Sequence, residues 1–361
     1  MVDNDRLKSL NHVNVKKEGL ILEKTDLFFE DHAVLNPACI KIDEVVHMFY
    51  RAVRKAGMIS SIGYCKLKNN VVVERSQNPI LVPEYEHEQN GIEDPRIVCI
   101  EGTYILTHTM YDGHNVLTGY ATTTCLPDFK KRGYLLPKIT FGEVKQLFKR
   151  SNPKCAKSFF WHQKKYIPSL TDRDYIWIKN AVFFPRKING KFVLLHRILP
   201  GIHLISFDHL SDLKHNFWHD YLPNLDQYTL FYPRYVFENH HIAPSAPPIE
   251  TDKGWIFIYH AAEATHSGLV YRAAVALLDL ENPQKVLGRL TYPLFGPEEK
   301  WERLGAVNNI VFPTAAIKGK NNRLYIYYGG ADSVIGCRSV DIDELLQALI
   351  HSNYDPTLCC G

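Results

Sequence analysis

The sequence lacks any apolar run long enough to cross a bilayer, and its first residues, MVDNDRLKSLNHVNVKKEG, contain no apolar core of a signal peptide. Cys occurs eight times, but no C-x-x-C pair is present, so neither a zinc site nor a redox motif is predicted. The formal net charge is only +3, which is too small to indicate a nucleic-acid or membrane partner. We therefore expect a cytoplasmic protein without a metal site.

No Gly-rich nucleotide loop follows a strand pattern, so no nucleotide cofactor is expected. Hydrophobic residues make up 45% and charged residues 22% of the 361 positions, as in ordinary folded proteins. The 20 Tyr, 18 Phe and 5 Trp stand out. Aromatic rings stack on sugar rings, but β-rich proteins also carry many aromatics, so both interpretations stay open.

One hairpin pattern recurs five times, in segments that begin at Leu35, Glu93, Lys179, Ala243 and Val311. Each segment has an apolar strand, a polar turn and a second strand rich in aromatic or branched residues. A shorter piece after each hairpin reads as a third strand with a turn toward a fourth. Five units of about four strands predict an all-β fold, a five-bladed β-propeller with its active site in the central funnel. A sandwich or barrel is the competing all-β fold.

The predicted propeller spans residues 31–345, between an N-terminal extension (1–30) that packs on it and a C-terminal tail (346–361). Two insertions, at about 127–175 and 208–239, do not fit the repeat. GEVKQLFKR in the first insertion and IDELLQALI near the end are predicted helices. The aromatic residues of the second insertion suit a sugar platform, a packed cap or a subunit contact equally well. A homo-oligomer is therefore possible.

In a propeller the innermost strands bring equivalent positions together around the axis, although they lie far apart in sequence. Polar side chains at these positions form the predicted site: Asn36, Arg51, Asp94, Arg96, Lys179, Asn180, Arg197, His241, Tyr259, His260, Tyr271 and Asp332. One acid facing several cations suits an anionic reactant beside a proton donor. A structural ring of salt bridges is the alternative.

The balance of carboxylates and cations separates two ways of cleaving a glycoside. An inverting hydrolase needs a second carboxylate to activate water. A phosphorylase needs cations instead, because phosphate is already a nucleophile and Arg or Lys hold it through charge-assisted hydrogen bonds.

From about Leu35 to Val340 the chain resembles glycoside hydrolase family 130, the mannoside phosphorylases and β-mannosidases. The motifs that carry the resemblance are GIEDPRI, KNAVFFPRKINGKFVLLHR, APPIETDKGWIFIYHA, YRAAVALLDLENPQKVLGR and YIYYGGAD. The resemblance implies a five-bladed propeller and β-mannosides as substrates.

The resemblance also implies roles for single residues. Asp94 matches the general acid, which in the family acts through the mannose 3-hydroxyl. The other matches fall into two groups. Sugar contacts are implied for Asn36, Arg51 and Asp332, and phosphate contacts for Lys179, Arg197, Tyr271 and His260. Arg96 and Asn180 are further predicted substrate contacts. Inorganic phosphate would be a co-substrate, and no other cofactor is expected.

One departure weakens the phosphate assignment. His241 occupies a position that is commonly Lys in the phosphorylases, and His is only partly charged near neutral pH. Glu238 and Glu263 lie near this segment, and either would be the base of a hydrolase if water replaced phosphate. The favoured interpretation of both is a solvated loop residue, and the base is the alternative. The leading hypothesis is inverting phosphorolysis that yields α-mannose 1-phosphate. The alternatives are an inverting β-mannosidase and a non-catalytic carbohydrate-binding propeller.

Overall fold

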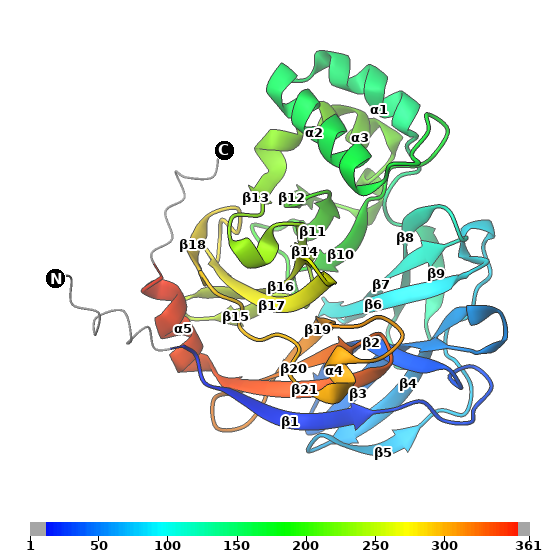
Figure 1. The fold of residues 1–361 in the computed structure, drawn as a ribbon, viewed down its shortest axis with the longest axis vertical. Helices are drawn as coiled ribbons and strands as arrows, with labels where there is room; N and C mark the ends of the chain where they lie inside the picture. The colour runs from blue at the N-terminus through cyan, green and yellow to red at the C-terminus, as the bar shows by residue number, and fades with distance from the viewer. Residues whose placement is uncertain (1–11, 353–361) are drawn as a thin grey trace.

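Strands dominate the computed structural model, which describes residues 12–352 of the chain (Figure 1). Within these residues the strands form four hydrogen-bonded sheets. The largest has eight strands, but its halves are joined by a single parallel bridge between Ser60 and Gly91. This sheet therefore divides into two four-stranded units, which gives five units within residues 12–352.

Each unit begins with a hairpin at the place that the repeat predicts. The first two units are β2 (Ala33–Ile42), β3 (Val45–Val53), β4 (Ser60–Lys68), β5 (Val71–Arg75), and β6 (Gly91–Ile100), β7 (Thr103–Tyr111), β8 (Val116–Thr123), β9 (Lys130–Tyr134). The third is β10 (Lys179–Phe183), β11 (Phe192–Ile198), β12 (Gly201–Phe207) and β13 (Thr229–Phe231). The fourth is β14 (His241–Pro244), β16 (Gly254–Thr265), β17 (Gly268–Leu278) and β18 (Val286–Arg289), with β15 (Ile249–Thr251) beside β16. The five predicted hairpins are confirmed.

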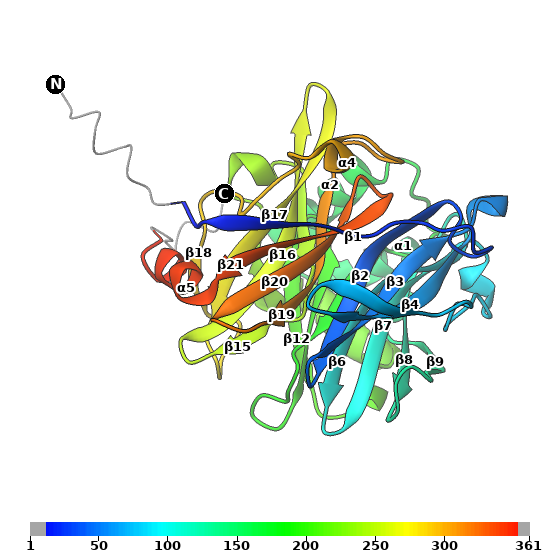
Figure 2. The ribbon, with the colours of Figure 1, turned by 90° about the horizontal axis from the view of Figure 1, so that it is seen from below.

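The fifth unit combines both ends of the described chain. It contains β19 (Val311–Lys318), β20 (Arg323–Gly330) and β21 (Val334–Asp341), and its outer strand is β1 (Val15–Leu22), which runs antiparallel to β21. Figure 2 shows β1 lying beside β21. The predicted extension 1–30 thus supplies a strand to the last sheet, while its residues 1–11 lie outside the described residues.

The first strands of the units meet around one centre (Figure 1). Strand β2 contacts β6 and β19, β6 also contacts β10, β10 contacts β14, and β19 contacts β16 and β17. The apolar cores lie between neighbouring units. Between the third and fourth units, for example, Val182 and Leu195 pack in one core with Trp255 and Phe257. Because each core joins two units, the units are held in a fixed order around the centre.

The two predicted insertions build a cap of helices beside the third unit (Figure 1). We define the helical cap as α1 (Phe141–Leu147), α2 (Pro153–Tyr166) and α3 (His215–Tyr221) with the 3₁₀ segments Phe148–Arg150 and Leu222–Tyr228. The helix predicted from GEVKQLFKR is confirmed as α1 and the turn that follows it. The insertions are shorter than predicted, because 130–134 and 229–231 form β9 and β13 of the sheets.

The aromatic residues of the second insertion pack inward. Trp218 and Tyr221 are fully buried against the cap, and Phe231 lies in the core between the third and fourth units. None of these residues lines the cavity described below. The packed-cap interpretation is therefore the correct one for these rings, and the sugar-platform interpretation is wrong for them.

The last helix, α5 (Ile342–Ile350), is the one predicted from IDELLQALI, and its Leu345 and Leu349 are buried. The predicted boundary at residue 346 is wrong, since it falls inside this packed helix. The short helix α4 (Lys300–Arg303) precedes β19. No helix within residues 12–352 combines the length and the apolar character needed to cross a membrane.

Candidate active site

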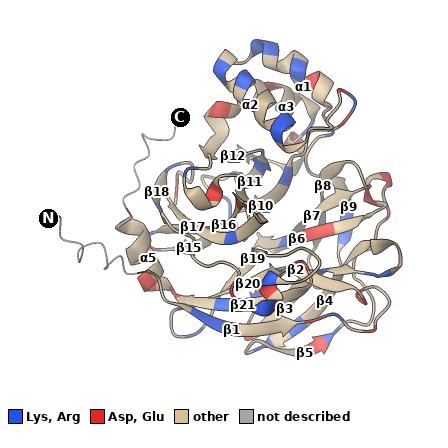
Figure 3. Cartoon of the chain, viewed as in Figure 1, with Lys and Arg blue, Asp and Glu red and all other residues tan. Residues whose placement is uncertain are grey.

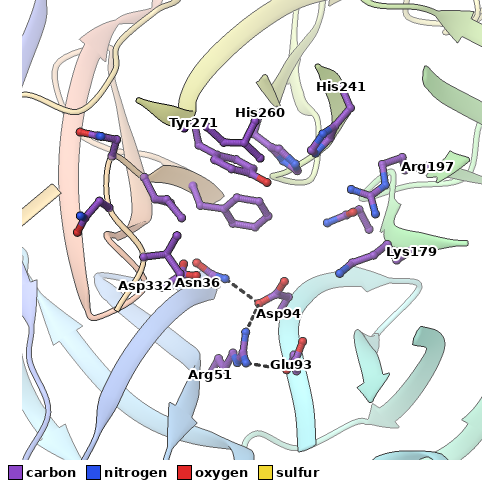
Figure 4. Close-up of a pocket in the computed structure, with 18 of the residues that line it drawn as sticks. Asn36, Arg51, Glu93, Asp94, Lys179, Arg197, His241, His260, Tyr271 and Asp332 are labelled. Atoms are coloured by element: carbon purple, nitrogen blue, oxygen red, sulfur yellow. Dashed lines mark hydrogen bonds and ion pairs between the residues drawn. The ribbon is translucent and has the colours of Figure 1, made fainter. Parts of the chain in front are cut away.

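A cavity of about 570 Å³ is lined by residues from all five units (Figure 4). Ten residues predicted from the sequence line it: Asn36, Arg51, Asp94, Lys179, Asn180, Arg197, His241, His260, Tyr271 and Asp332. The fold thus gathers side chains that are separated by up to about three hundred positions in the sequence. A polar cavity with convergent charged groups is the expected form of a substrate site.

Three of the polar side chains come from equivalent backbone irregularities. Asn36, Asp94 and Asn180 lie where the first strand of each of the first three units slips in register against its partner, as in a β-bulge. Their φ angles are 48°, 51° and 58°, in the left-handed region that Asn and Asp tolerate better than most residues. Bulges re-aim side chains near active sites. The repeat therefore places an Asn or Asp at the cavity in each of these units.

Asp94 lies among positive charges and hydrogen-bond donors. The Asn36 side-chain amide donates to its Oδ1 at 2.7 Å, and an Arg51 Nη1 lies 3.8 Å from the same oxygen. Burial raises the pKa of Asp94, but Arg51, Lys179 and Arg96 together with the Asn36 hydrogen bond outweigh burial and hold the pKa below its usual value. Without substrate, Asp94 is therefore an ionised carboxylate.

Arg51 is fixed by neighbours on two strands. Its Nη2 donates to Glu93 Oε1 at 2.6 Å, and its Nε donates to Ser60 Oγ at 2.9 Å. Glu93 precedes Asp94 on β6. Because Glu93 forms an ion pair with Arg51, it neutralises much of the Arg51 charge. This leaves Arg51 as an oriented hydrogen-bond donor beside Asp94 rather than a free cation.

Lys179 and Arg197 form the opposite wall of the cavity (Figure 4). They are direct cross-strand partners on β10 and β11. Across residues 12–352 neither side chain has an ion-pair partner, and Arg197 is buried. Burial lowers the pKa of Arg197 to about 10 and, with the neighbouring Arg197, also lowers the pKa of Lys179. Like charges placed directly opposite each other destabilise a sheet, so this pair suits a bound anion.

Three rings complete the wall above these cations. The rings of His241 and Tyr271 are 5.8 Å apart, and that of His260 lies 5.9 Å from Tyr271. Burial, followed by nearby positive charges, holds the pKa values of both His residues well below the usual range. Both are therefore neutral near pH 7. His241 does not replace the charge of the expected Lys, but each imidazole still offers one donor and one acceptor.

Asp332 is the third carboxylate of the lining, after Glu93 and Asp94. It follows β20 in a turn with φ 50° and lies on the Asp94 side of the cavity in Figure 4. Burial raises its pKa to about 6; Arg51 opposes this shift, and the charge of Asp94 adds to it. Two nearby carboxylates thus have pKa values pushed in opposite directions.

Arg96 does not line the cavity, which corrects its prediction as a substrate contact. It is buried behind Asp94, where its Nη1 donates at 2.9 Å to the backbone oxygens of Asp94 and Pro95. Its Nε donates to the backbone oxygen of Ser245 in the fourth unit. Arg96 therefore supports the bulge that carries Asp94. Tyr259 also lies outside the cavity lining, because its ring is buried and its hydroxyl binds Glu238.

Glu238 belongs to a repeated structural ion pair. It is fully buried and accepts two hydrogen bonds of 2.7 Å from Arg289, while its Oε2 also accepts from the backbone N–H of Tyr235. A buried Glu precedes the first strand of three other units and pairs with a cation on a later strand of the same unit: Glu30–Arg75, Glu88–Lys131 and Glu302–Arg338. Glu238 is therefore structural, and the structure contradicts its prediction as a base.

Glu263 also lies outside the cavity lining. Its Oε2 accepts two hydrogen bonds from Arg272, at 3.0 and 2.7 Å. A carboxylate held this way by a guanidinium is a poor base, so the prediction of Glu263 as an alternative base is not supported by its position either.

Several residues of the cavity lining were not predicted from the sequence. Phe312 lies beside His260, with ring centres 4.2 Å apart and the ring planes tilted by 43°. Asn308 and Asn309 come from the segment before β19. Glu93 had a visible signal, since it stands beside Asp94 in GIEDPRI. The segment before β19 carries no comparable sequence signal, because no local pattern indicates that it lies at the cavity.

Comparison with known proteins identifies the family of the chain. The model of glycoside hydrolase family 130, described as β-1,4-mannooligosaccharide phosphorylase, matches residues 12–351. The chain is 32% identical over 336 residues to a 1,2-β-oligomannan phosphorylase of Thermoanaerobacter sp. (strain X514), covering 90% of this chain and 96% of that protein. It is 30% identical to a β-1,2-mannobiose phosphorylase of the same organism, covering 88% and 93%.

Among solved structures, the β-1,2-mannobiose phosphorylase of Listeria innocua superposes with a TM-score of 0.68. The superposition covers 93% of this chain and 99% of that one, at 20% identity. At this identity the likeness shows a shared fold.

Proposed function

Because the chain belongs to glycoside hydrolase family 130, a family of mannoside phosphorylases, we propose that it cleaves β-linked mannosides with inorganic phosphate. The products would be α-mannose 1-phosphate and an acceptor shortened by one mannose. Inversion at the anomeric carbon follows when phosphate attacks from the face opposite the leaving oxygen. We further infer that the five units are the blades of a propeller, because their first strands meet around the cavity.

The uncompensated pair Lys179 and Arg197 carries this proposal. Two cations stand directly opposite each other on β10 and β11, and no carboxylate within residues 12–352 pairs with either. Holding both charges in a polar but partly desolvated wall costs free energy that a bound phosphate would recover. Tyr271 and the neutral His241 supply further hydrogen-bonding groups beside them.

Asp94 would supply the proton to the leaving oxygen. The family resemblance implies that this proton passes through the mannose 3-hydroxyl, which would release its own proton to the oxygen as the bond to carbon breaks. A phosphate oxygen forms the new bond to the anomeric carbon. A proton from phosphate or solvent then restores Asp94, so charge and protons balance over one turnover.

Phosphate binding would also prepare Asp94 for this role. The free site holds the pKa of Asp94 low through Arg51, Lys179 and Arg96. A bound phosphate places negative charge near Lys179 and offsets its field, which raises the pKa of Asp94 toward the working range of a general acid. The acid would then become competent when the nucleophile is in place.

The hydrolase alternative needs a base on the phosphate side of the sugar. The carboxylates that line the cavity, among the described residues, are Glu93, Asp94 and Asp332. Figure 4 shows Glu93 beside Arg51 and Asp332 on the side away from Arg197, while Asp94, the proposed proton donor, faces Lys179. Glu93 is also bound to Arg51. The carboxylate positions therefore favour phosphate over water as the nucleophile.

The relatives named for β-1,2-linked mannosides align over most of the chain, which favours β-1,2-mannooligosaccharides as the first substrates to test. The assay incubates the protein with β-1,2- and β-1,4-mannobiose, with and without phosphate. Mannose 1-phosphate formed only with phosphate supports the proposal. Free mannose formed equally without phosphate would indicate the hydrolase. No product from any mannoside would indicate a binding protein.

A further inference from the structure

A group of metal-binding side chains lies on the helical cap, outside the candidate active site. His215 and His219 are on α3, and Glu143 is on α1. None of the three lines the cavity around Asp94. Figure 3 shows that Lys and Arg predominate on this cap, so a carboxylate with two imidazoles stands apart from its surroundings.

The spacing of the two His residues fits a shared ligand. Positions four apart on a helix lie on the same face, and two His at this spacing with a nearby carboxylate is a common arrangement for zinc. The rings of His215 and His219 have their centres 4.0 Å apart. One ligand atom from each of the three residues lies within 4.8 Å of the others.

The distances are close to those of a tetrahedral site. Zinc binds His nitrogen and carboxylate oxygen at about 2.0–2.2 Å, so adjacent corners of a tetrahedron are about 3.4 Å apart. His215 Nε2 lies 3.5 Å from Glu143 Oε1. The ligand atom of His219 lies within 4.8 Å of both.

Neighbouring groups orient the ligands without occupying them. Glu143 Oε2 accepts hydrogen bonds of 2.7 Å from both the backbone N–H and the hydroxyl of Thr140, which leaves Oε1 directed at His215. His219 Nε2 is buried and has no hydrogen-bond partner among the described residues. Among nearby cations, Arg150 donates at 3.3 Å to the backbone oxygen of His219, and Lys145 on α1 pairs with Asp172. Metal-binding carboxylates are typically oriented by hydrogen bonds from neighbouring groups, as Thr140 orients Glu143. An imidazole nitrogen that lacks a partner within residues 12–352, as in His219, is free to bind a metal.

We propose that Glu143, His215 and His219 bind a divalent transition-metal ion, with Zn²⁺ as the best fit. Two imidazoles and one carboxylate suit Zn²⁺, and water would take the fourth position on the exposed side. The ion would join α3 to α1, two helices contributed by different insertions. No metal site was predicted from the sequence, because His215 and His219 are far from Glu143 along the chain.

The test uses the full chain, freed of any polyhistidine tag and treated with a chelator. ZnCl₂ is titrated against a chromophoric indicator, and Co²⁺ is titrated separately to record the visible absorption of tetrahedral Co²⁺. We expect one equivalent of Zn²⁺ to bind and the tetrahedral Co²⁺ spectrum to appear. Absence of saturable binding at one equivalent would overturn the proposal.

Variants identify the site. His215→Ala and His219→Ala each remove one ligand, and Glu143→Gln keeps an acceptor for Thr140 while removing the charge. Each should weaken Zn²⁺ binding at least about tenfold, since even outer groups of metal sites cost about 10–100-fold when lost. His209→Ala changes an exposed His six residues before His215 and should bind like the wild type. If either Ala variant fails to fold, Zn²⁺ binding by the Glu143→Gln variant tests the site instead. Unchanged binding in Glu143→Gln and the folded His variants refutes the assignment.

Discussion

Asn36 and Asp94 are joined by a 2.7 Å hydrogen bond between two units of the fold, and both residues have left-handed backbone conformations. Each lies at the register slip of its own strand, β2 or β6. The amide of Asn36 donates to Asp94 and therefore favours the ionised carboxylate. The same backbone feature thus both aims the acid at the cavity and lowers its pKa.

Replacing Asp94 by Asn tests its role as the acid. Asn keeps the side-chain shape and tolerates the left-handed backbone, but it cannot transfer a proton. We expect turnover on a β-mannobiose to fall about a hundredfold or more, with little change in fold. Steady-state release of mannose 1-phosphate measures the effect, and near-normal turnover would remove Asp94 from its proposed role.

Asp94→Ala separates backbone strain from chemistry. Ala lacks the short polar side chain that makes the left-handed conformation acceptable, so the Ala variant should be about 1–2 kcal/mol less stable than the Asn variant. Urea unfolding of the two variants measures this difference. Equal stabilities would show that the φ of 51° at this position carries no strain.

Replacing Lys179 by Met tests the anion site. Loss of a charge-assisted contact should raise the KM for phosphate about 10–100-fold, and Arg197→Ala should do the same. Lys179→Met should also stabilise the phosphate-free protein by up to about 1 kcal/mol, because it removes one of two opposed cations. The substitution should thus weaken phosphate binding and increase folding stability. Such opposite effects are expected at a residue that serves binding at the expense of stability.

Lys66→Met is the matched control for that test. Lys66 is also a strand residue, but it pairs with Glu74 across β4 and β5 and does not line the cavity. Its loss should leave phosphate dependence unchanged and alter stability by less than about 0.5 kcal/mol. If Lys179→Met behaved like Lys66→Met, the anion site would lie elsewhere.

The sequence was sufficient for the hairpins and for most of the lining of the cavity. A turn with Gly between alternating strands is a local signal, and the repeat then implies that Asn36, Asp94 and Asn180 occupy equivalent places. What the sequence does not contain is the register slip that turns these side chains inward. A bulge depends on how one strand pairs with the next, and pairing is not a local property.

Long-range pairing also explains the errors. Glu238 looked like a possible base because it stands near His241, but its partner Arg289 comes 51 positions later. Arg96 looked like a substrate contact because it follows Asp94, yet its Nε reaches Ser245 in the fourth unit. In both cases the direction of the side chain was decided by a residue that no local pattern identifies.

Asp332 should make stability depend on pH in an unusual direction. Its folded pKa is about 6, above the ordinary value of 3.8, because burial and the charge of Asp94 favour the neutral form. A raised pKa stabilises the folded state fully below about pH 4, and this contribution is lost as the pH rises through 6. Asp332→Asn should therefore be more stable than the wild type at pH 7–8 but not at pH 4.

The gain should be on the order of 1–2 kcal/mol at pH 8, since the side chain is half-buried and solvent screens part of the shift. Urea unfolding at pH 4, 6 and 8 measures it. An Asn variant less stable than the wild type at pH 8 would mean that ionised Asp332 is well compensated by Arg51.

Glu238→Gln distinguishes a structural carboxylate from a base. Gln keeps the size but leaves Arg289 charged and buried without its counter-ion, which should cost about 3–5 kcal/mol of stability. Glu302→Gln removes the carboxylate of the equivalent pair with Arg338 in the fifth unit, outside the cavity lining. It should also destabilise the fold, but by less, because Glu298 Oε1 lies 3.5 Å from Arg338 and remains as a second counter-ion. Both folded variants should retain phosphorolysis at low temperature. If Glu238→Gln instead kept full stability and lost activity while Glu302→Gln did not, Glu238 would act in the reaction, because a structural pair alone cannot produce that difference.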